Sequence, residues 1–244
     1  MSINLFVVTD NRLWFEKLHR SSTLSIQKIN IDLYCSPKGA HLFKSELSAG
    51  SIAVVDLNKV KRNWVLKYDF GISAHCKQIF PVELLRDVRC FNIHPGFNPH
   101  NRGWFPQVFS IINKQPIGVT IHEMDEKIDH GEIVIQKKLT IDEDYTSKDV
   151  YDRLIELEFE CFEEVIDSLT DNTYKSFPPA DEGNYNSISD YRSLCEIDLD
   201  KSITMREAID YLRAMTHPPY HNAYFLDSNE QKVYVEISFS KKHT

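Results

Sequence analysis

The first half of the chain alternates short apolar runs with segments whose apolar residues recur every three or four positions. Uninterrupted apolar runs are typical of strands that are covered on both faces of a parallel sheet. The pattern predicts strands over residues 3–8, 31–35, 51–56, 67–73 and 89–94, and helices over residues 12–20, 40–48 and 82–87. This alternation predicts an α/β fold built on a mostly parallel sheet.

The middle of the chain departs from this alternation. Residues 118–124 and 131–141 predict two strands joined by a short loop, which indicates a hairpin. The longest helical pattern then begins at Ser147 and continues to Leu169. Over residues 171–198 the periodicity disappears and Asn, Asp, Ser, Pro and Gly accumulate, so we expect an irregular connection there.

The end of the chain has a pattern of its own. Thr204 and Glu207 have the spacing of a capping box, which predicts a helix that runs to about Met215. Strand-like residues 223–226 and 232–239 follow, joined by a polar loop typical of a hairpin. We therefore expect a catalytic core over residues 1–178 and a C-terminal region over residues 179–244 with a small helix and a β-hairpin.

Composition and charge exclude several classes of protein. The chain has 244 residues, 42% of them hydrophobic, which is enough for a sizeable core. Its net charge of −8 argues against a nucleic-acid binder. No apolar run approaches the roughly 20 residues of a membrane-spanning helix, and the first residues lack the pattern of a signal peptide. We expect a cytoplasmic protein that binds neither nucleic acid nor membrane.

Metal sites and ordinary nucleotide-binding loops are also not expected. The five cysteines are widely spaced and none belongs to a Cys-x-x-Cys pair, and neither a His-x-x-x-His spacing nor a carboxylate at matching spacing gives a metal cluster. The chain contains neither Gly-x-Gly-x-x-Gly nor a phosphate-binding P-loop.

Three polar residues could together support acyl transfer. Asn92 and His94 stand two apart at the end of a predicted strand, so both side chains leave it on one face. Asp129 lies in a tight loop before Gly131 and is suited to point inward. When an amine attacks a carbonyl, the site needs a hydrogen-bond donor, a base and a group that orients the base. Such residues also have purely structural roles, so spacing alone leaves both interpretations open.

Two segments resemble a known family. Asn92-Ile93-His94-Pro95 with Asn101-Arg102-Gly103 and Pro106, and residues 118–133 with Asp129 at 35 positions from His94, resemble the signature of 10-formyltetrahydrofolate-dependent formyltransferases. The sequence of these segments most resembles that of sugar N-formyltransferases, although residues 96–99 depart from the usual Ser-Leu-Leu-Pro. The resemblance implies a Rossmann-like core, 10-formyltetrahydrofolate as the formyl donor, and Asn92, His94 and Asp129 as the catalytic residues.

The same resemblance implies where the ligands bind. It places residues 73–81 in a loop that faces folate and substrate, and it assigns folate contacts to Ile79, Phe80, Asp125 and Asp129. A nucleotide sugar needs flat side chains for its base and donors or cations for its diphosphate. The candidates are His75, Lys77, Trp104, Tyr185, Arg213, Tyr220 and Tyr224, and any of them could equally serve packing alone.

The function that follows is transfer of a formyl group to the amine of a dTDP-linked amino-dideoxy sugar, with dTDP-4-amino-4,6-dideoxyglucose favoured, for O-antigen or surface polysaccharide synthesis. The alternatives are a glycinamide ribonucleotide formyltransferase, a catalytically silent module that binds folate or sugar nucleotide, and a formyl-folate hydrolase. The sequence leaves open whether the formylated amine is at sugar C3 or C4, and whether the nucleotide carrier is dTDP or UDP. The resemblance also implies a homodimer formed through the C-terminal β-hairpin.

Overall fold

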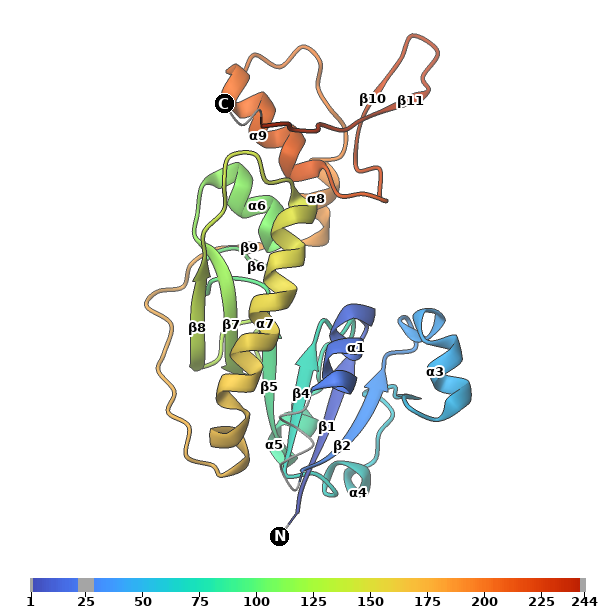
Figure 1. Ribbon diagram of the computed structural model, residues 1–244, viewed down its shortest axis with the longest axis vertical. Coiled ribbons are helices and arrows are strands. Elements are labelled where there is room, and N and C mark those ends of the chain that lie inside the picture. The colour runs from blue at the N-terminus through green and yellow to red at the C-terminus, as the bar shows by residue number, and fades with distance from the viewer. Residues whose placement is uncertain (1, 22–28, 242–244) are drawn as a thin grey trace. The chain divides into compact units, whose positions relative to one another are not determined.

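A computed structural model describes residues 2–21 and 29–241, and its central feature is a seven-stranded sheet (Figure 1). From edge to edge the strands are β3 (Ala53–Val54), β2 (Ile29–Cys35), β1 (Ile3–Thr9), β4 (Phe70–Ala74), β5 (Arg89–His94), β7 (Ile117–Glu123) and β8 (Ile133–Leu139). The first five strands in this order are parallel, and β7 runs antiparallel to β5. The predicted α/β fold with a mostly parallel sheet is confirmed.

The uninterrupted apolar run of β1 is explained by burial on both faces. Leu5, Phe6, Val7 and Val8 are all fully buried. Phe6 and Val8, which are two apart and so share a face, pack in one cluster with residues from α4 (Arg62–Val65) and α5 (Val82–Asp87). A strand with a solvated face would alternate apolar with polar residues, and β1 does not.

Two long-range aromatic contacts tie helices together in the same part of the chain. Trp14 of α1 (Arg12–Arg20) packs edge-on against Phe159 and Phe162 of α7 (Ser147–Thr170). These contacts join the first helix of the chain to the longest one. The apolar spacing that predicted α7 therefore marks residues that are buried in the core.

Two predicted elements are shorter than expected, for a local reason. The helix expected over residues 40–48 is divided into the 3-10 turn η1 (Ala40–Leu42) and the helix α3 (Lys44–Ala49). Phe43 lies between them with its ring buried against Phe15, in a cluster that includes Cys35 and Ile52. The chain bends to bury this ring, and the strand expected over residues 51–56 retains only Ala53–Val54.

The chain divides into two compact units, each assembled from three segments. One contains residues 1–94, 119–137 and 157–180, and the other contains residues 95–118, 138–156 and 181–244. The single boundary predicted at about residue 178 stays a prediction, because contacts define discontinuous units. No helix in the two described ranges is both long and apolar enough to cross a membrane.

The second unit contains short elements from the middle of the chain together with those of the C-terminal region. They are α6 (Pro106–Asn113), β6 (Arg102–Gly103) paired in parallel with β9 (Tyr185–Asn186), α8 (Ile188–Ser193), α9 (Met205–Met215), and β10 (Ala223–Leu226) paired antiparallel with β11 (Lys232–Val235). The predicted capping box is confirmed: Thr204 Oγ1 accepts from the Glu207 amide, and the Glu207 carboxylate accepts from the Thr204 amide. The C-terminal hairpin is also present, but its second strand ends at Val235 and not at Phe239 as predicted.

Two helices of this unit were not predicted from the sequence. Helix α6 begins with Pro106 at its first position, a placement that proline favours, but only two turns follow. Helix α8 lies inside the segment expected to be irregular, where Ser187 and Asp190 form a second capping box. Both helices are too short for the apolar spacing to be distinctive.

Candidate active site

Two polar side chains stand at the end of a central strand. Asn92 and His94 occupy alternate positions of β5, and the adjacent antiparallel strand β7 places His122 opposite Asn92 and Thr120 opposite His94. Because β5 is hydrogen-bonded to β4 on one side and β7 on the other, its backbone is fixed along its length. The His94 side chain is only 5% exposed. The sheet therefore fixes the backbone of both residues, with His94 buried and Asn92 partly buried.

The turn between β7 and β8 brings a carboxylate back toward this strand end. Asp129 has a left-handed backbone, with φ of 51°, which reverses the chain just before Gly131. A Cβ atom at Gly131 would stand 1.9 Å from the Glu123 carbonyl oxygen, so only glycine lets the two arms of the turn approach this closely. The Asp129 side chain is 9% exposed.

The structure brings Asn92, His94 and Asp129 together. Asn92 Nδ2 donates a hydrogen bond to Asp129 Oδ1 over 2.9 Å. The other carboxylate oxygen, Oδ2, lies 3.6 Å from His94 Nδ1. One carboxylate thus faces both the amide and the imidazole, which is an arrangement suited to orienting a base beside a hydrogen-bond donor.

A second imidazole, from His122, completes this polar cluster and was not among the predicted site residues. His122 Nδ1 lies 2.7 Å from the Glu123 carbonyl oxygen, and because a carbonyl only accepts, Nδ1 carries the proton. Its Nε2 lies 3.4 Å from Asn92 Nδ2 and 3.5 Å from Asp129 Oδ1. The position of His122 opposite Asn92 in the sheet depends on antiparallel pairing that the sequence alone does not specify.

Comparison with known proteins agrees with this geometry. The family described as "Formyl transferase" matches residues 57–166, and the "N-formyltransferase dimerization C-terminal domain" matches residues 190–241. A Mycobacterium bovis relative, "dTDP-4-amino-4,6-dideoxyglucose formyltransferase", is 47% identical over 173 residues, which is 71% of this chain and 74% of the relative. The chain belongs to the formyltransferase family.

Solved structures of N-formyltransferases match this enzyme over at least 99% of its length. A 4-N formyltransferase from Francisella tularensis is 49% identical, covers 99% of both chains and superposes with a TM-score of 0.94. A sugar N-formyltransferase from a Shewanella species is 38% identical, covers 100% of both chains and has a TM-score of 0.92. The chain is thus a formyltransferase of the sugar N-formyltransferase type.

The residues predicted to bind folate in the formyltransferase differ in their surroundings. Ile79 is 73% exposed, whereas Phe80 is 2% exposed and stacks on Phe6 in the core. A folate contact at Phe80 would therefore use its backbone. The exposed Asp125 accepts a hydrogen bond from the Lys127 amide and pairs with His130 at 3.2 Å. Their folate contacts stay predictions.

Two predicted substrate residues follow directly after β4. His75 Nε2 lies 2.7 Å from Glu158 Oε2 of α7, and the His75 backbone is left-handed, with φ of 58°. The Lys77 amide donates to Asp10 Oδ2, while its side chain is exposed. The structure places both residues at the carboxyl edge of the sheet, where open α/β sheets bind ligands.

The predicted aromatic contacts of the formyltransferase lie in the second unit. Trp104, Tyr185 and Tyr220 each have large exposed rings, and Tyr185 lies in β9, paired with Arg102 of β6. Tyr224 packs edge-on against Tyr234 in the C-terminal hairpin, and the Lys232 ammonium stands 3.9 Å from its ring centroid. Which of these rings meets a nucleobase stays a prediction.

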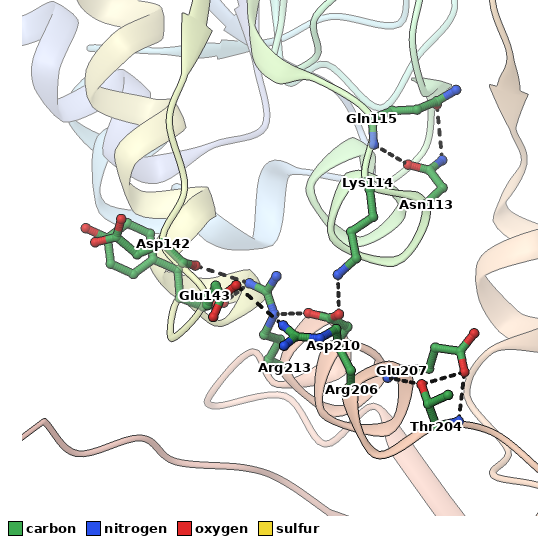
Figure 2. A network of polar contacts seen from close by, with 11 residues as sticks. Asn113, Lys114, Gln115, Asp142, Glu143, Thr204, Arg206, Glu207, Asp210 and Arg213 are labelled. Carbon is green, nitrogen blue, oxygen red and sulfur yellow. Dashed lines mark hydrogen bonds and ion pairs between the residues drawn. The ribbon is translucent and has the colours of Figure 1, made fainter.

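Arg213 is held in a polar network within the second unit (Figure 2). Its Nε donates to Asp210 Oδ1 over 2.7 Å, and its Nη1 donates to the carbonyls of Asp142 and Tyr145. Asp210 also pairs with Lys114. Burial raises the pKa of Asp210, but the hydrogen bonds from Lys114 and Arg213 outweigh it and lower that pKa overall. Arg213 thus anchors α9 to the segment before α7, and a substrate contact by it stays a prediction.

Proposed function

We propose that this enzyme transfers the formyl group of 10-formyltetrahydrofolate to the 4-amine of dTDP-4-amino-4,6-dideoxyglucose. The substrate assignment is supported by the name of the Mycobacterium bovis relative and by the 4-N formyltransferase from Francisella tularensis, both almost half identical to this chain over the aligned residues. A formylated dideoxy sugar of this kind would serve surface polysaccharide synthesis, including O-antigen.

The observation that carries the proposed chemistry is the placement of the Asp129 carboxylate between Asn92 and His94. The sugar amine attacks the formyl carbon, which forms a carbon–nitrogen bond and moves an electron pair to the formyl oxygen. Asn92 donates a hydrogen bond to this oxyanion. Since Asp129 lies on the Nδ1 side of His94, we assign removal of the amine proton to Nε2.

The second half of the reaction breaks the bond between the formyl carbon and N10 of the folate. The oxyanion collapses to a carbonyl, and N10 receives a proton as it leaves. His94 carries the proton taken from the amine, and Asp129 supports the resulting imidazolium and aids proton delivery to N10. The products are the formamido sugar and tetrahydrofolate, and no covalent enzyme intermediate is needed.

We also propose that the enzyme acts as a homodimer formed through β10 and β11. The match of residues 190–241 to a dimerization domain of N-formyltransferases supports this proposal. Val233 and Tyr234 of β11 carry exposed apolar side chains, and a two-stranded ribbon is marginally stable by itself. A twofold pairing would cover the same patch on both subunits.

A substrate panel tests the proposed reaction. The enzyme is incubated with 10-formyltetrahydrofolate and dTDP-linked 4-amino or 3-amino sugars, a UDP-linked amino sugar, or glycinamide ribonucleotide, and the products are analysed by mass spectrometry. We expect a gain of about 28 Da on dTDP-4-amino-4,6-dideoxyglucose, with kcat/KM at least about tenfold above the other acceptors. Formate release without an acceptor, or a preference for glycinamide ribonucleotide, would refute the proposal.

A further inference from the structure

The loop over residues 75–78 begins beside the candidate catalytic residues. Strands β4 and β5 are parallel, with Ala74 aligned with Ile93, so His75 leaves its strand level with His94. Ligands of open α/β sheets bind at the carboxyl ends of the strands, and this loop forms part of that edge. Two buried carboxylates, from Asp10 and Glu158, hold its backbone and its first side chain.

Asp10 is the first of these carboxylates and connects three strand ends. It follows β1 directly, its Oδ1 accepts from the Ser36 amide after β2 over 2.8 Å, and its Oδ2 accepts from the Lys77 amide after β4 over 2.7 Å. Asp10 is buried, and Gly39 packs so closely on it that a Cβ there would stand 1.9 Å from Oδ1. The position of the Lys77 backbone is therefore set by a residue from another strand.

Glu158 is the second carboxylate and holds the start of the loop. Its side chain is 0% exposed, and its Oε2 lies 2.7 Å from His75 Nε2. His75 adopts a left-handed backbone that is unfavourable for a residue with a Cβ, and such conformations persist where neighbouring contacts enforce them. The pair with Glu158 is a contact that enforces this turn.

The ammonium that this loop presents has no carboxylate partner in the part of the chain that the structure describes. Lys77 is exposed, and among residues 2–21 and 29–241 no carboxylate lies within ion-pair distance of its Nζ. Burying carboxylates is expensive and adds little net stability compared with apolar packing. The two buried carboxylates that hold this short loop are therefore better explained by the need to place the Lys77 ammonium than by a gain in folding stability.

We propose that Asp10 and Glu158 are positioning residues that fix the loop of residues 75–78 so that Lys77 meets the diphosphate of the nucleotide sugar. The inference rests on the proposed function, because that function supplies the diphosphate. Asp10 and Glu158 act through Lys77 and contact no substrate themselves. Their loss should weaken nucleotide binding while the chemical step at saturation is retained.

Calorimetric titration with dTDP, with folinic acid as the second probe, tests the proposal. Asp10→Asn replaces one acceptor oxygen by a donor that opposes an amide N–H, and we expect the Kd for dTDP to rise about tenfold. The Kd for folinic acid and the kcat at saturating substrates should stay within about twofold. Asp69→Asn is the matched control. Asp69 also accepts a hydrogen bond from a backbone amide, that of Asn4, but near the amino ends of the strands and away from the loop of residues 75–78.

A double-mutant cycle with Lys77→Ala separates positioning from general damage. If Asp10 acts through Lys77, Asp10→Asn should change the Kd for dTDP less than about twofold in the Lys77→Ala background. Glu158→Gln, which keeps an acceptor for His75 but removes the charge, should show the same non-additivity. It provides the test if Asp10→Asn does not fold.

The outcomes distinguish this inference from the proposed function. Equal effects of Asp10→Asn with and without Lys77, or equal weakening of folinic acid and dTDP, would overturn the positioning role while wild-type formyl transfer stands. A change in melting temperature without a change in the Kd for dTDP would also overturn it. A wild-type enzyme that neither binds dTDP nor formylates the amino sugar would overturn both.

Discussion

Asn92 and Asp129 are 37 residues apart in sequence, yet the Asn92 amide nitrogen donates to Asp129 Oδ1 over 2.9 Å. One N–H of this amide is therefore committed to the carboxylate, and the same nitrogen lies 3.4 Å from His122 Nε2. The second N–H of the amide is the donor assigned to the oxyanion, and groups from the β7–β8 hairpin orient the amide. This relationship makes the placement of Asn92 as important as its identity.

Replacing the proposed base should abolish the chemical step and spare binding. We expect His94→Asn to lower kcat by a factor of about 10²–10⁴, because general-base catalysis contributes on this scale. The Kd values for dTDP and folinic acid should remain within a few-fold of wild type. Single-turnover kinetics and calorimetry measure both quantities, and near wild-type kcat in this variant would rule out the assigned role.

His122 should act through Asn92 and Asp129 rather than on substrate. His122→Gln retains a polar group beside Asn92 and Asp129, so we expect kcat to fall less than about tenfold with an unchanged KM. His122→Leu places an apolar group against this amide and carboxylate, and we expect a loss of about 10–100-fold in kcat. Steady-state kinetics of the two variants make the comparison. Equal losses in both would contradict a polar role for His122.

The Asp210 network should make stability depend on pH. The pKa of Asp210 is lowered in the folded enzyme, so its contribution is present above the unfolded value of about 3.9 and is lost as the pH falls through the folded pKa. Asp210→Asn should destabilise the protein by about 3 kcal/mol at pH 7, because it leaves Arg213 buried without its carboxylate. Urea unfolding at pH 7 and pH 3 should show this difference shrinking in acid.

A surface carboxylate provides the control for that measurement. Asp152 pairs with Lys148 in an exposed position, and Asp152→Asn should cost less than about 1 kcal/mol at pH 7. A pH-independent difference between wild type and Asp210→Asn would show that the network contributes by packing and not by charge.

The proposed dimer predicts the mass in solution. Light scattering at micromolar concentration should give about twice the chain mass of 28.4 kDa. Introducing charge at the exposed apolar positions of β11, with Val233→Glu and Tyr234→Glu together, should give a monomer, since burying unpaired carboxylates opposes association. Asn229→Lys in the hairpin loop is the control. A wild-type monomer at these concentrations would exclude the dimer.

Much of the fold follows from local patterns that are strong and independent of context. The helices over residues 12–20 and 82–87, the strand over residues 89–94 and the capping box at Thr204 were predicted with the boundaries that the structure has. Each carries a signal within a few residues: a cap, a proline that opens a helix, or the Pro95-Gly96 pair that ends the strand. The division of the helix at Phe43 has no such signal, since it depends on where that ring finds a partner.

Sequence by itself determined the residue types of the candidate site and the family to which the chain belongs. Asn92 and His94 share a face because side chains alternate along any strand, and Asp129 precedes the glycine that its turn requires. Only the tertiary structure decided that β5 is followed in the sheet by the antiparallel strand β7, which places His122 against Asn92. It alone also placed Asp10 and Glu158 on the loop of Lys77, because contacts over 67 and 83 residues depend on how distant strands and helices pack and not on any local pattern.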